Sequence, residues 1–491
     1  MKFRDHNYVG ITQSLCPECL SLVQAKVVVR DNRVYFRKHC PTHGTREDFV
    51  CSDATMFDRN EYSLPGKVPI SYGVEVRSGC PYDCGLCEEH EQHTCIGLLE
   101  ITQHCNLSCP ICFAKSGPGG EHLTRQQCQA AIDRLVEVET QPEVLQLSGG
   151  EPTVHPEFEA ILKYACDQPI DVVMVNTNGV AIAHDPALVQ LLESLKHRCE
   201  VYFQFDSFED PAVEAIRGQS LVQTKLKAIE ALGAAGIRTT LVCTLQPGVN
   251  EDQIGPLAEF AAQRPWITGL SFQPTTYTGR YFLPKDLESR ITFPDVIHGL
   301  EKQSAGVWKA GDFSPLPCAH PNGHSLAYAY RRQSDSGAKV LPLARFIDFE
   351  EHLDLLAGRI TFDRSRAKEL LENYLKSTAC GNLPALKAEA ITKMAGGEGA
   401  DLQSEFLQKA LTKTLAPEDM LRITTTSFMD AYNFDVRQLM KSCVHHLLPS
   451  GHIIPFSAYN VLYRDGHVTL PELKGEPKRS TAPSLVSLNQ P

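Results

Sequence analysis

The run Cys105-Asn106-Leu107-Ser108-Cys109-Pro110-Ile111-Cys112-Phe113 decides how the rest of this chain is interpreted. Its cysteines have the spacing CxxxCxxC, and three thiolates can hold three of the four irons of a [4Fe–4S] cluster. The fourth iron then has no protein ligand and can bind a substrate or cosubstrate, as the open position of a catalytic zinc does. Short cysteine spacings also occur in structural zinc sites. The sequence around the triplet has to separate these two interpretations.

The surrounding sequence favours the cluster. An apolar, strand-like run over 97–102 leads directly into the triplet, and a helical pattern over 126–138 and an apolar strand over 144–147 follow it. Next comes Ser148-Gly149-Gly150-Glu151-Pro152, whose glycines let the backbone approach a ligand closely. A glycine-rich turn alone is a weak signal. Behind a CxxxCxxC triplet at this distance it is a strong one.

The triplet and the GGEP loop together resemble the radical S-adenosylmethionine (SAM) superfamily over about residues 97–280. The resemblance implies that Cys105, Cys109 and Cys112 hold a [4Fe–4S] cluster whose open iron is chelated by SAM. It also implies that the Gly149, Gly150 and Glu151 loop receives the SAM amino group. Reductive cleavage of SAM then gives a 5′-deoxyadenosyl radical, which abstracts hydrogen from an unactivated carbon.

Apolar strand-like segments alternate with amphipathic helical ones through this region, which predicts a parallel sheet with right-handed crossovers. Six repeats match the partial (β/α)6 barrel of the superfamily. The expected strands are 98–102, 144–147, 172–176, 201–206, 238–245 and 269–273, and the expected helices are 126–138, 156–165, 187–197, 221–235 and 251–264. The predicted fold class is α/β, with a small β-rich metal-binding domain before the barrel and an α+β domain after it.

Polar residues at the ends of the expected strands are candidates for the lining of the site, because sites in such barrels form at the carboxyl ends of the strands. Asn176 and Asn178 follow the third strand, Asp206 the fourth and Gln273 the sixth. By resemblance, the Asn176–Asn178 segment lies near the SAM ribose and carboxylate, and Phe113 flanks the adenine. Taken singly, each polar residue also fits a helix cap or a turn, and Phe113 fits simple core packing.

The first sixty residues carry a separate metal pattern. Cys16-Pro-Glu-Cys19 and Cys40-Pro-Thr-His43 flank strand-like runs joined by an Asp-Asn turn. Two such knuckles can build a tetrahedral site for one structural metal ion, as in a zinc ribbon or a rubredoxin. The fourth ligand is His43 or Cys51, and the spacing alone slightly favours zinc over iron.

A second CxxxCxxC, formed by Cys80, Cys84 and Cys87, is followed by Cys95. The GGEP loop lies at the proper distance from Cys105–Cys112 and not from this set. Cys95 would supply a fourth thiolate and close the cluster, so we expect an auxiliary [4Fe–4S] cluster here. The alternative is a zinc knuckle.

Composition restricts the class of protein. The chain has 491 residues with a net charge of −12, which argues against a nucleic-acid surface because phosphate binding needs clustered cations. There is no apolar run of about 18 residues and no secretory leader pattern. Eleven of its 18 cysteines precede residue 113, which suggests metal binding in a reducing compartment. We therefore expect a cytoplasmic protein that could contact a membrane peripherally. Its expected substrate is a small molecule or a lipid, and its expected partner is a reductant such as ferredoxin or flavodoxin.

The later sequence narrows the resemblance. The segments 315–322, 428–435, 443–445 and 454–456 look like the radical SAM group that contains archaeal tetraether-lipid synthase, members of which were linked to methylation of a dihydropterin. That group implies a rubredoxin-like iron and three [4Fe–4S] clusters, which favours iron over zinc at the N-terminal site. The third cluster would use Cys318, Cys443 and two further cysteines, but this chain has Gly323 and Ser457 at those two places. We therefore do not expect a third cluster.

These features suggest a metal-binding domain at 1–60, an auxiliary-cluster segment at 61–96, the barrel at 97–280, a C-terminal domain at 281–470 and a disordered tail at 471–491. The expected function is radical SAM chemistry at an unactivated carbon, such as carbon–carbon bond formation on a lipid or other apolar substrate. The alternatives are methyl transfer to a dihydropterin-like heterocycle, peptide modification, and a non-enzymatic role in electron transfer.

Overall fold

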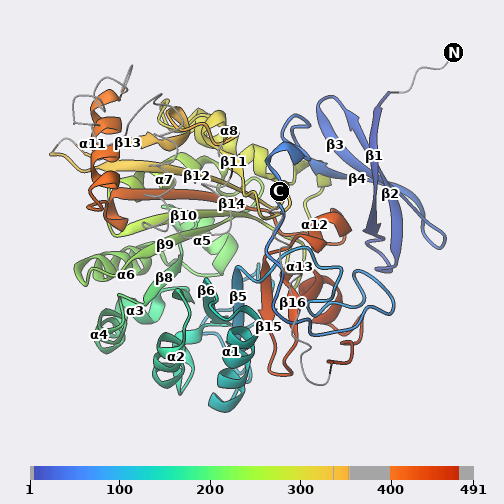
Figure 1. Ribbon diagram of the computed structural model, residues 1–491, viewed down its shortest axis with the longest axis horizontal. Helices are drawn as coiled ribbons and strands as arrows, with labels where there is room; N and C mark the ends of the chain where they lie inside the picture. The colour runs from blue at the N-terminus through green and yellow to red at the C-terminus, as the bar shows by residue number, and fades with distance from the viewer. Residues whose placement is uncertain (1–4, 336, 352, 354–398, 475–491) are drawn as a thin grey trace, which may run out of the picture.

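The computed structural model describes residues 5–335, 337–351, 353 and 399–474, so Cys380 and the expected tail beyond residue 474 lie outside it (Figure 1). Its strands form two sheets. The first is antiparallel and follows chain order through β1 (Asn7–Leu15), β2 (Leu22–Arg30), β3 (Arg33–Cys40) and β4 (Gly44–Cys51). Asp31 and Asn32 join β2 to β3 with φ angles of 51° and 60°, as a tight hairpin turn requires.

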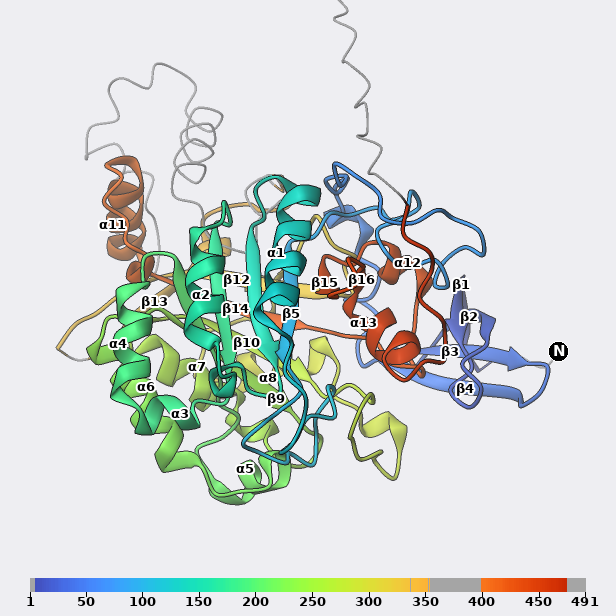
Figure 2. The same ribbon diagram turned by 90° about the horizontal axis from the view of Figure 1, so that it is seen from below.

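The second sheet contains the expected barrel. Six parallel strands lie side by side in chain order, and the helices that connect them pack on its outer face (Figures 1 and 2). The strands are β5 (Ile96–Thr102), β6 (Val144–Gly149), β7 (Val172–Thr177), β8 (Cys199–Gln204), β9 (Thr239–Leu245) and β10 (Ile267–Pro274). The helices are α1 (Arg125–Glu139), α2 (Phe158–Asp167), α3 (Val180–His184), α4 (Pro186–Ser194), α5 (Asp210–Arg217), α6 (Val222–Ala234) and α7 (Ile254–Ala262). The prediction of a partial α/β barrel is confirmed. The short helices α3 and α5 were not predicted, because one or two turns carry little periodicity.

The C-terminal region extends this sheet at both edges. Strand β14 (Met420–Thr426) pairs in parallel with β10, and β15 (Val444–Leu447) pairs in parallel with β5. Beyond them β12 (His324–Arg332) and β16 (Ile453–Pro455) pair antiparallel. Unpaired backbone groups at the edges of an open sheet need partners, and strands from after residue 281 supply them here. Short strands β11 (Ser314–Pro315) and β13 (Lys339–Pro342) pair with β12.

The structure describes four further helices, of which the first packs beside α7 in the main core. They are α8 (Phe293–Gln303), α11 (Ala400–Leu411), α12 (Val436–Met440) and α13 (Phe456–Ala458). The main core lies between the parallel strands and the outer helices, with Leu145, Val173 and Leu241 fully buried. The other face of the sheet curves around a cavity. No helix in the described part of the chain is long and apolar enough to cross a membrane.

The N-terminal sheet stands beside the barrel, next to α12 (Figures 1 and 2). Thr12 donates a 2.6 Å hydrogen bond to Asp435, and Arg33 forms a 2.6 Å ion pair with Glu288. Lys38 is buried and donates to the backbone oxygen of Tyr432 at 2.6 Å. The small sheet is thus attached to a segment before β11 and to the segment between β14 and β15.

Candidate functional site

The cavity enclosed by the barrel has a volume of about 180 Å³ and receives side chains from all eight parallel strands. Most residues that the sequence suggested for SAM binding meet here, although they come from distant parts of the chain. The lining contains Cys105, Cys109, Cys112, Phe113, Gly149, Gly150, Asn176, Asn178 and Gln273. Two predicted residues, Glu151 and Asp206, are not in the lining. They are buried behind it.

The cysteine triplet lies on the loop that follows β5. Cys112 exchanges backbone hydrogen bonds of 2.9 Å with Arg280, and the Arg280 side chain donates to the Cys109 carbonyl oxygen at 3.0 Å. Burial raises the pKa of the Cys105 thiol to about 12 and raises that of Cys109 as well. Such thiols hold their protons until a metal displaces them, because only the thiolate is a strong ligand. The loop therefore places three thiols in one cavity, where they can bind a metal centre.

The GGEP loop needs its two glycines for steric reasons. A Cβ atom on Gly149 would lie 2.1 Å from the Thr102 carbonyl oxygen, and one on Gly150 would lie 2.2 Å from that of His104. Gly149 also has a φ of +129°, which residues with a side chain rarely adopt. Only glycine lets this loop pack against the end of β5 beside the cysteine triplet.

Glu151 holds the GGEP loop to the end of β7. Its carboxylate accepts hydrogen bonds from Thr153 Oγ1 at 2.7 Å, Thr177 Oγ1 at 2.8 Å and the Asn178 backbone N–H at 2.7 Å. Burial raises the pKa of Glu151, while these donors oppose that rise. Asn178 in turn donates from Nδ2 to Asn106 Oδ1 at 2.7 Å, next to Cys105. Glu151 thereby positions one residue of the cavity lining.

A polar network covers one part of the cavity wall. Tyr202 donates to Ser271 Oγ at 3.1 Å and accepts from Gln273 Nε2 at 2.9 Å. Two buried atoms of the same wall, Asn176 Oδ1 and Thr240 Oγ1, have no hydrogen-bond partner among the described residues. Buried polar atoms usually have partners, so these two are suited to a polar ligand. The residues present therefore fit a bound polar group in the cavity.

Sequence reasoning missed part of the wall. Arg217, Thr240, Arg422, Thr424, Phe428 and Phe456 also line the cavity. The alternation along β14 could have identified Arg422 and Thr424 as sharing one face, but nothing in the sequence indicated that β14 belongs to the barrel. Arg217 ends a helix too short to predict.

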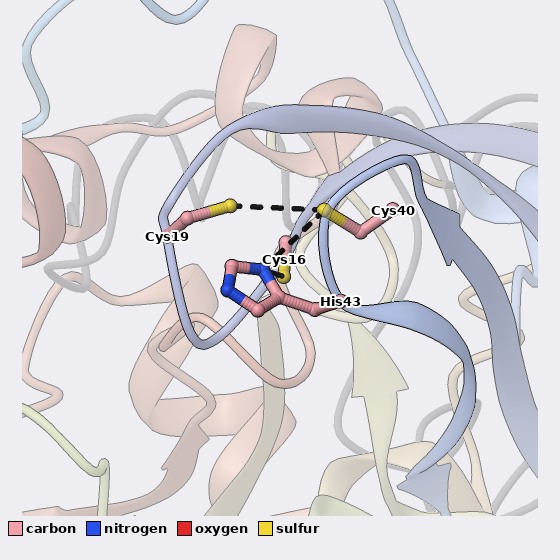
Figure 3. Close-up of side chains that lie close together, drawn as sticks. All are labelled: Cys16, Cys19, Cys40 and His43. Carbon is pink, nitrogen blue, oxygen red and sulfur yellow. Dashed lines mark hydrogen bonds between the residues drawn. The ribbon is translucent and has the colours of Figure 1, made fainter.

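The N-terminal cysteines form a compact four-ligand group with His43 (Figure 3). Cys16 Sγ and Cys40 Sγ each lie 3.5 Å from His43 Nδ1, and Cys19 Sγ lies 3.8 Å from Cys40 Sγ. Distances of this size suit the four ligands of one tetrahedral ion. Cys51, the other candidate for the fourth ligand, is buried in the main core instead.

The second CxxxCxxC triplet is divided from Cys95. Cys80, Cys84 and Cys87 line a small separate cavity together with Asp83, Glu89 and His90. Cys95 lies beside the thiols of Cys318 and Cys443. The structure thus brings together three of the four residues expected to bind the auxiliary cluster and places the fourth elsewhere.

Comparison with known proteins agrees with this geometry. A model of the radical SAM superfamily matches residues 99–261, and a model of the HMPTM N-terminal zinc ribbon domain matches residues 8–52. The 7,8-dihydro-6-hydroxymethylpterin dimethyltransferase of Methanocaldococcus jannaschii is 32% identical over 483 residues, which cover 92% of this chain and 94% of the relative. The chain belongs to the radical SAM superfamily, in the group of this dimethyltransferase.

Other proteins that are similar to this radical SAM protein match only part of its length. Mycofactocin maturase MftC of Mycobacterium ulcerans is 32% identical over 166 residues, covering 33% of this chain and 42% of the maturase. The crystal structure of Streptococcus suis SuiB bound to precursor peptide SuiA has 15% identity and a TM-score of 0.37, covering 43% of this chain and 45% of SuiB. Membership of the superfamily implies a transferase-type enzyme that uses a [4Fe–4S] cluster and SAM. For the N-terminal site, the matching zinc ribbon domain names zinc. The resemblance to the tetraether-lipid synthase group favoured iron.

Proposed function

We propose that this radical SAM enzyme modifies an unactivated carbon of a heterocycle related to dihydropterins, by transfer of a methyl group. The observation that carries the proposal is the polar wall of the cavity. Tyr202, Gln273 and Thr240 offer both hydrogen-bond donors and acceptors inside the cavity. A pterin edge carries alternating donors and acceptors, which such a wall can pair. The name of the Methanocaldococcus relative supports the same substrate class.

We assign the cofactor contacts by their places in the cavity. Cys105, Cys109 and Cys112 would ligate the cluster, while the Gly149–Gly150 backbone, Asn176 and Asn178 would hold SAM, with Phe113 beside the adenine. When bound, the cluster and SAM supply a 5′-deoxyadenosyl radical. Glu151 and Asp206, both buried behind the lining, would act as positioning residues. The protein's own task is to exclude water and orient the carbon that reacts.

The apolar part of the cavity supports a second candidate, which is carbon–carbon bond formation on an apolar chain. Phe428 stacks on Phe456 with ring centroids 3.9 Å apart, and Phe113 meets Phe456 edge to face with centroids 5.1 Å apart. Leu98, Leu316 and Leu326 continue this surface. A substrate with a hydrocarbon portion would bury it here.

For electron supply we propose an auxiliary cluster at Cys80, Cys84 and Cys87 and a reducing partner such as ferredoxin or flavodoxin. The three cysteines line one cavity, and burial raises the pKa of Cys87. With Cys95 elsewhere, the fourth ligand would come from another group. His90 and Glu89 line the same cavity.

The test is an anaerobic assay of the reconstituted enzyme with SAM, dithionite and 6-hydroxymethyl-7,8-dihydropterin, using SAM labelled with ¹³C in its methyl group. We expect 5′-deoxyadenosine and methionine from one SAM, and a labelled methylpterin and S-adenosylhomocysteine from a second SAM, with dithionite supplying the two electrons. All four products should be absent from the Cys105→Ala/Cys109→Ala/Cys112→Ala variant. Replacement of Cys128, a buried cysteine on α1, by Ala serves as a matched control. When a lipid replaces the pterin, a coupled lipid that carries no label would select the second candidate, because chain coupling uses no SAM methyl group. No 5′-deoxyadenosine with either substrate, from protein with full iron content, would contradict both.

A further inference from the structure

The loop that carries the cysteine triplet is joined to the segment that follows β10. Cys112 and Arg280 form an isolated antiparallel bridge, with backbone hydrogen bonds of 2.9 Å in both directions. The triplet follows β5, and β5 and β10 are separated by four other strands of the parallel sheet. The bridge therefore connects the first and last strands of the six-stranded barrel at their carboxyl ends, where the sheet itself does not join them.

A glycine allows the two segments to approach this closely. Gly279 has a φ of +70°, and a Cβ atom on it would lie 2.4 Å from the carbonyl oxygens of both Cys112 and Phe113. Such a contact is a steric clash, and a φ in this range favours glycine. The next residue, Arg280, is consequently held beside the cysteine loop.

The Arg280 side chain donates hydrogen bonds to the cysteine loop from all three of its nitrogens. Nε donates to the Cys109 carbonyl oxygen at 3.0 Å, and Nη1 donates to that of Lys115 at 3.1 Å. Nη2 donates to the Ser116 carbonyl oxygen. A guanidinium holds its N–H donors in a rigid planar fork, whereas a lysine ammonium is a point charge on a flexible stem. Only arginine can therefore hold these three carbonyl groups in one fixed arrangement.

The segment fixed by these bonds in turn contacts the first cysteine of the triplet. The backbone N–H of Cys105 donates to the Gly117 carbonyl oxygen at 3.0 Å, and the backbone N–H of Lys115 donates to that of Cys112 at 3.2 Å. Arg280 is therefore connected to every cysteine of the triplet. It reaches the third through the backbone bridge, the second through its side chain, and the first through the segment that ends at Gly117.

Arg280 also brings a positive charge that these contacts do not neutralise. Its three nitrogens donate to uncharged carbonyl oxygens, whereas the ammonium group of Lys115 on the same loop forms a 2.6 Å ion pair with Asp465. A reduced iron–sulfur cluster carries one more negative charge than an oxidised one, so a cation nearby favours the reduced form. The guanidinium is thus placed to affect both the geometry and the reduction of a cluster held by this loop.

We propose that Arg280 is a positioning residue for the three cluster cysteines and that its charge raises the reduction potential of the cluster they hold. The first role needs the planar fork of the guanidinium, and the second needs only a cation, so substitution can separate the two. The inference rests on the cluster contacts of the proposed function, but it does not depend on which substrate the enzyme modifies.

The experiment compares wild type, Arg280→Lys and Arg280→Met as full-length protein after anaerobic reconstitution. Electron paramagnetic resonance follows the reduced cluster during a redox titration, and the signal that SAM changes identifies the cluster of the triplet. We expect the midpoint potential to fall in Arg280→Met and to stay near the wild-type value in Arg280→Lys. Because neither variant keeps the fork, the dissociation constant for SAM, measured from the same signal, should rise about tenfold or more in both.

Lys115→Met is the matched control, because it removes a positive charge from the same loop and keeps the contacts of Arg280. It should bind SAM as wild type does. Unchanged affinity for SAM in both Arg280 variants would overturn the positioning role. An unchanged midpoint potential in Arg280→Met would overturn the electrostatic role.

Loss of cluster iron from Arg280→Met, in a chain that circular dichroism shows to be folded, would also support the positioning role. The potential is then measured in Arg280→Gln, which is neutral and can still donate to one carbonyl oxygen. None of these measurements uses the pterin. Absence of methylpterin together with the expected shifts would therefore contradict the proposed substrate and support this role of Arg280, whereas a wild-type signal that SAM does not change would overturn both.

Discussion

The Arg217 guanidinium donates two hydrogen bonds of 2.7 Å to the Asp206 carboxylate, and the side chains are 8% and 0% exposed. Asp206 also accepts from the Thr244 backbone N–H at 2.9 Å, so the pair joins the end of β8 to α5 and β9. Burial raises the pKa of the neighbouring Cys109 thiol, and the Arg217 charge opposes that rise. This ion pair therefore supports both the barrel rim and a thiolate at Cys109.

Replacement of Arg217 by Met should destabilise the protein strongly, because Asp206 would keep a buried charge without its partner. Loss of one member of a buried pair costs about 3–5 kcal/mol. Chemical unfolding of the reconstituted protein measures the free energy of unfolding. Iron analysis should show less cluster iron per chain in this variant. The control is Lys163→Met, which removes an exposed ion pair on α2 and should cost less than about 1 kcal/mol. Equal effects of both substitutions would contradict the role of the buried pair.

Lys225 should give the protein a measurable dependence of stability on alkaline pH. Burial lowers the pKa of Lys225 to about 8, from an ordinary value of 10.5. Between these values the unfolded chain holds a proton that the folded chain has released. The free energy of unfolding therefore rises with pH across this window, by up to about 1.4 kcal/mol per pH unit. Unfolding curves at several pH values should show this slope reduced in Lys225→Met.

The matched control for Lys225 lies on the same helix. Lys227 is exposed on α6, so Lys227→Met should retain the wild-type slope between pH 8 and 10.5. A slope that Lys225→Met leaves unchanged would show that its buried ammonium group does not titrate in this range.

Glu151→Ala should weaken SAM binding without removing the cluster cysteines. The carboxylate accepts three hydrogen bonds of 2.7–2.8 Å that connect the GGEP loop to Asn178. Loss of one charged hydrogen bond costs about 1.5–3 kcal/mol, so we expect the dissociation constant for SAM to rise at least about tenfold. Equilibrium dialysis under anaerobic conditions measures it. Glu157→Ala, an exposed neighbour, should leave it unchanged.

Gln273→Leu should separate substrate recognition from SAM cleavage. The Gln273 side chain donates to Tyr202 OH at 2.9 Å within the polar wall. An apolar replacement should lower formation of methylpterin about tenfold or more, while 5′-deoxyadenosine formed without substrate stays near the wild-type rate. If the substrate is instead an apolar chain, its turnover should not fall in this variant. Product analysis by mass spectrometry distinguishes these results.

The N-terminal site should carry one metal ion that Cys19→Ser removes. Cys16, Cys19, Cys40 and His43 form the four-ligand group, whereas Cys51 lies in the core. Cys51→Ala should therefore keep the ion. Metal analysis of the two variants gives the comparison, and visible absorption decides the metal because zinc sites are colourless. Loss of the ion in Cys51→Ala alone would make Cys51 the fourth ligand.

Elements with local sequence signals could be predicted correctly. The alternation of apolar strands with amphipathic helices predicted β5–β10 and most of their helices, because each segment has its own periodic pattern of apolar residues. The spacing of Cys105, Cys109 and Cys112 predicted a cluster, and the resemblance of this triplet and the GGEP loop to the radical SAM superfamily implied that the enzyme uses SAM. Such motifs can be recognised in a sequence because their residues lie close together in the chain.

Features that depend on contacts between distant segments could not be predicted and became visible only in the folded chain. Only the pairing of β15 with β5 and of β14 with β10 showed that C-terminal strands extend the barrel. The same pairing places Cys95 beside Cys443 and not beside the cysteines expected to bind the auxiliary cluster, although Cys95 is only eight residues from Cys87 in the sequence. Strand register sets which side chains meet across a sheet. The spacing of cysteines near residue 95 carries no information about the register of β15, which begins at Val444.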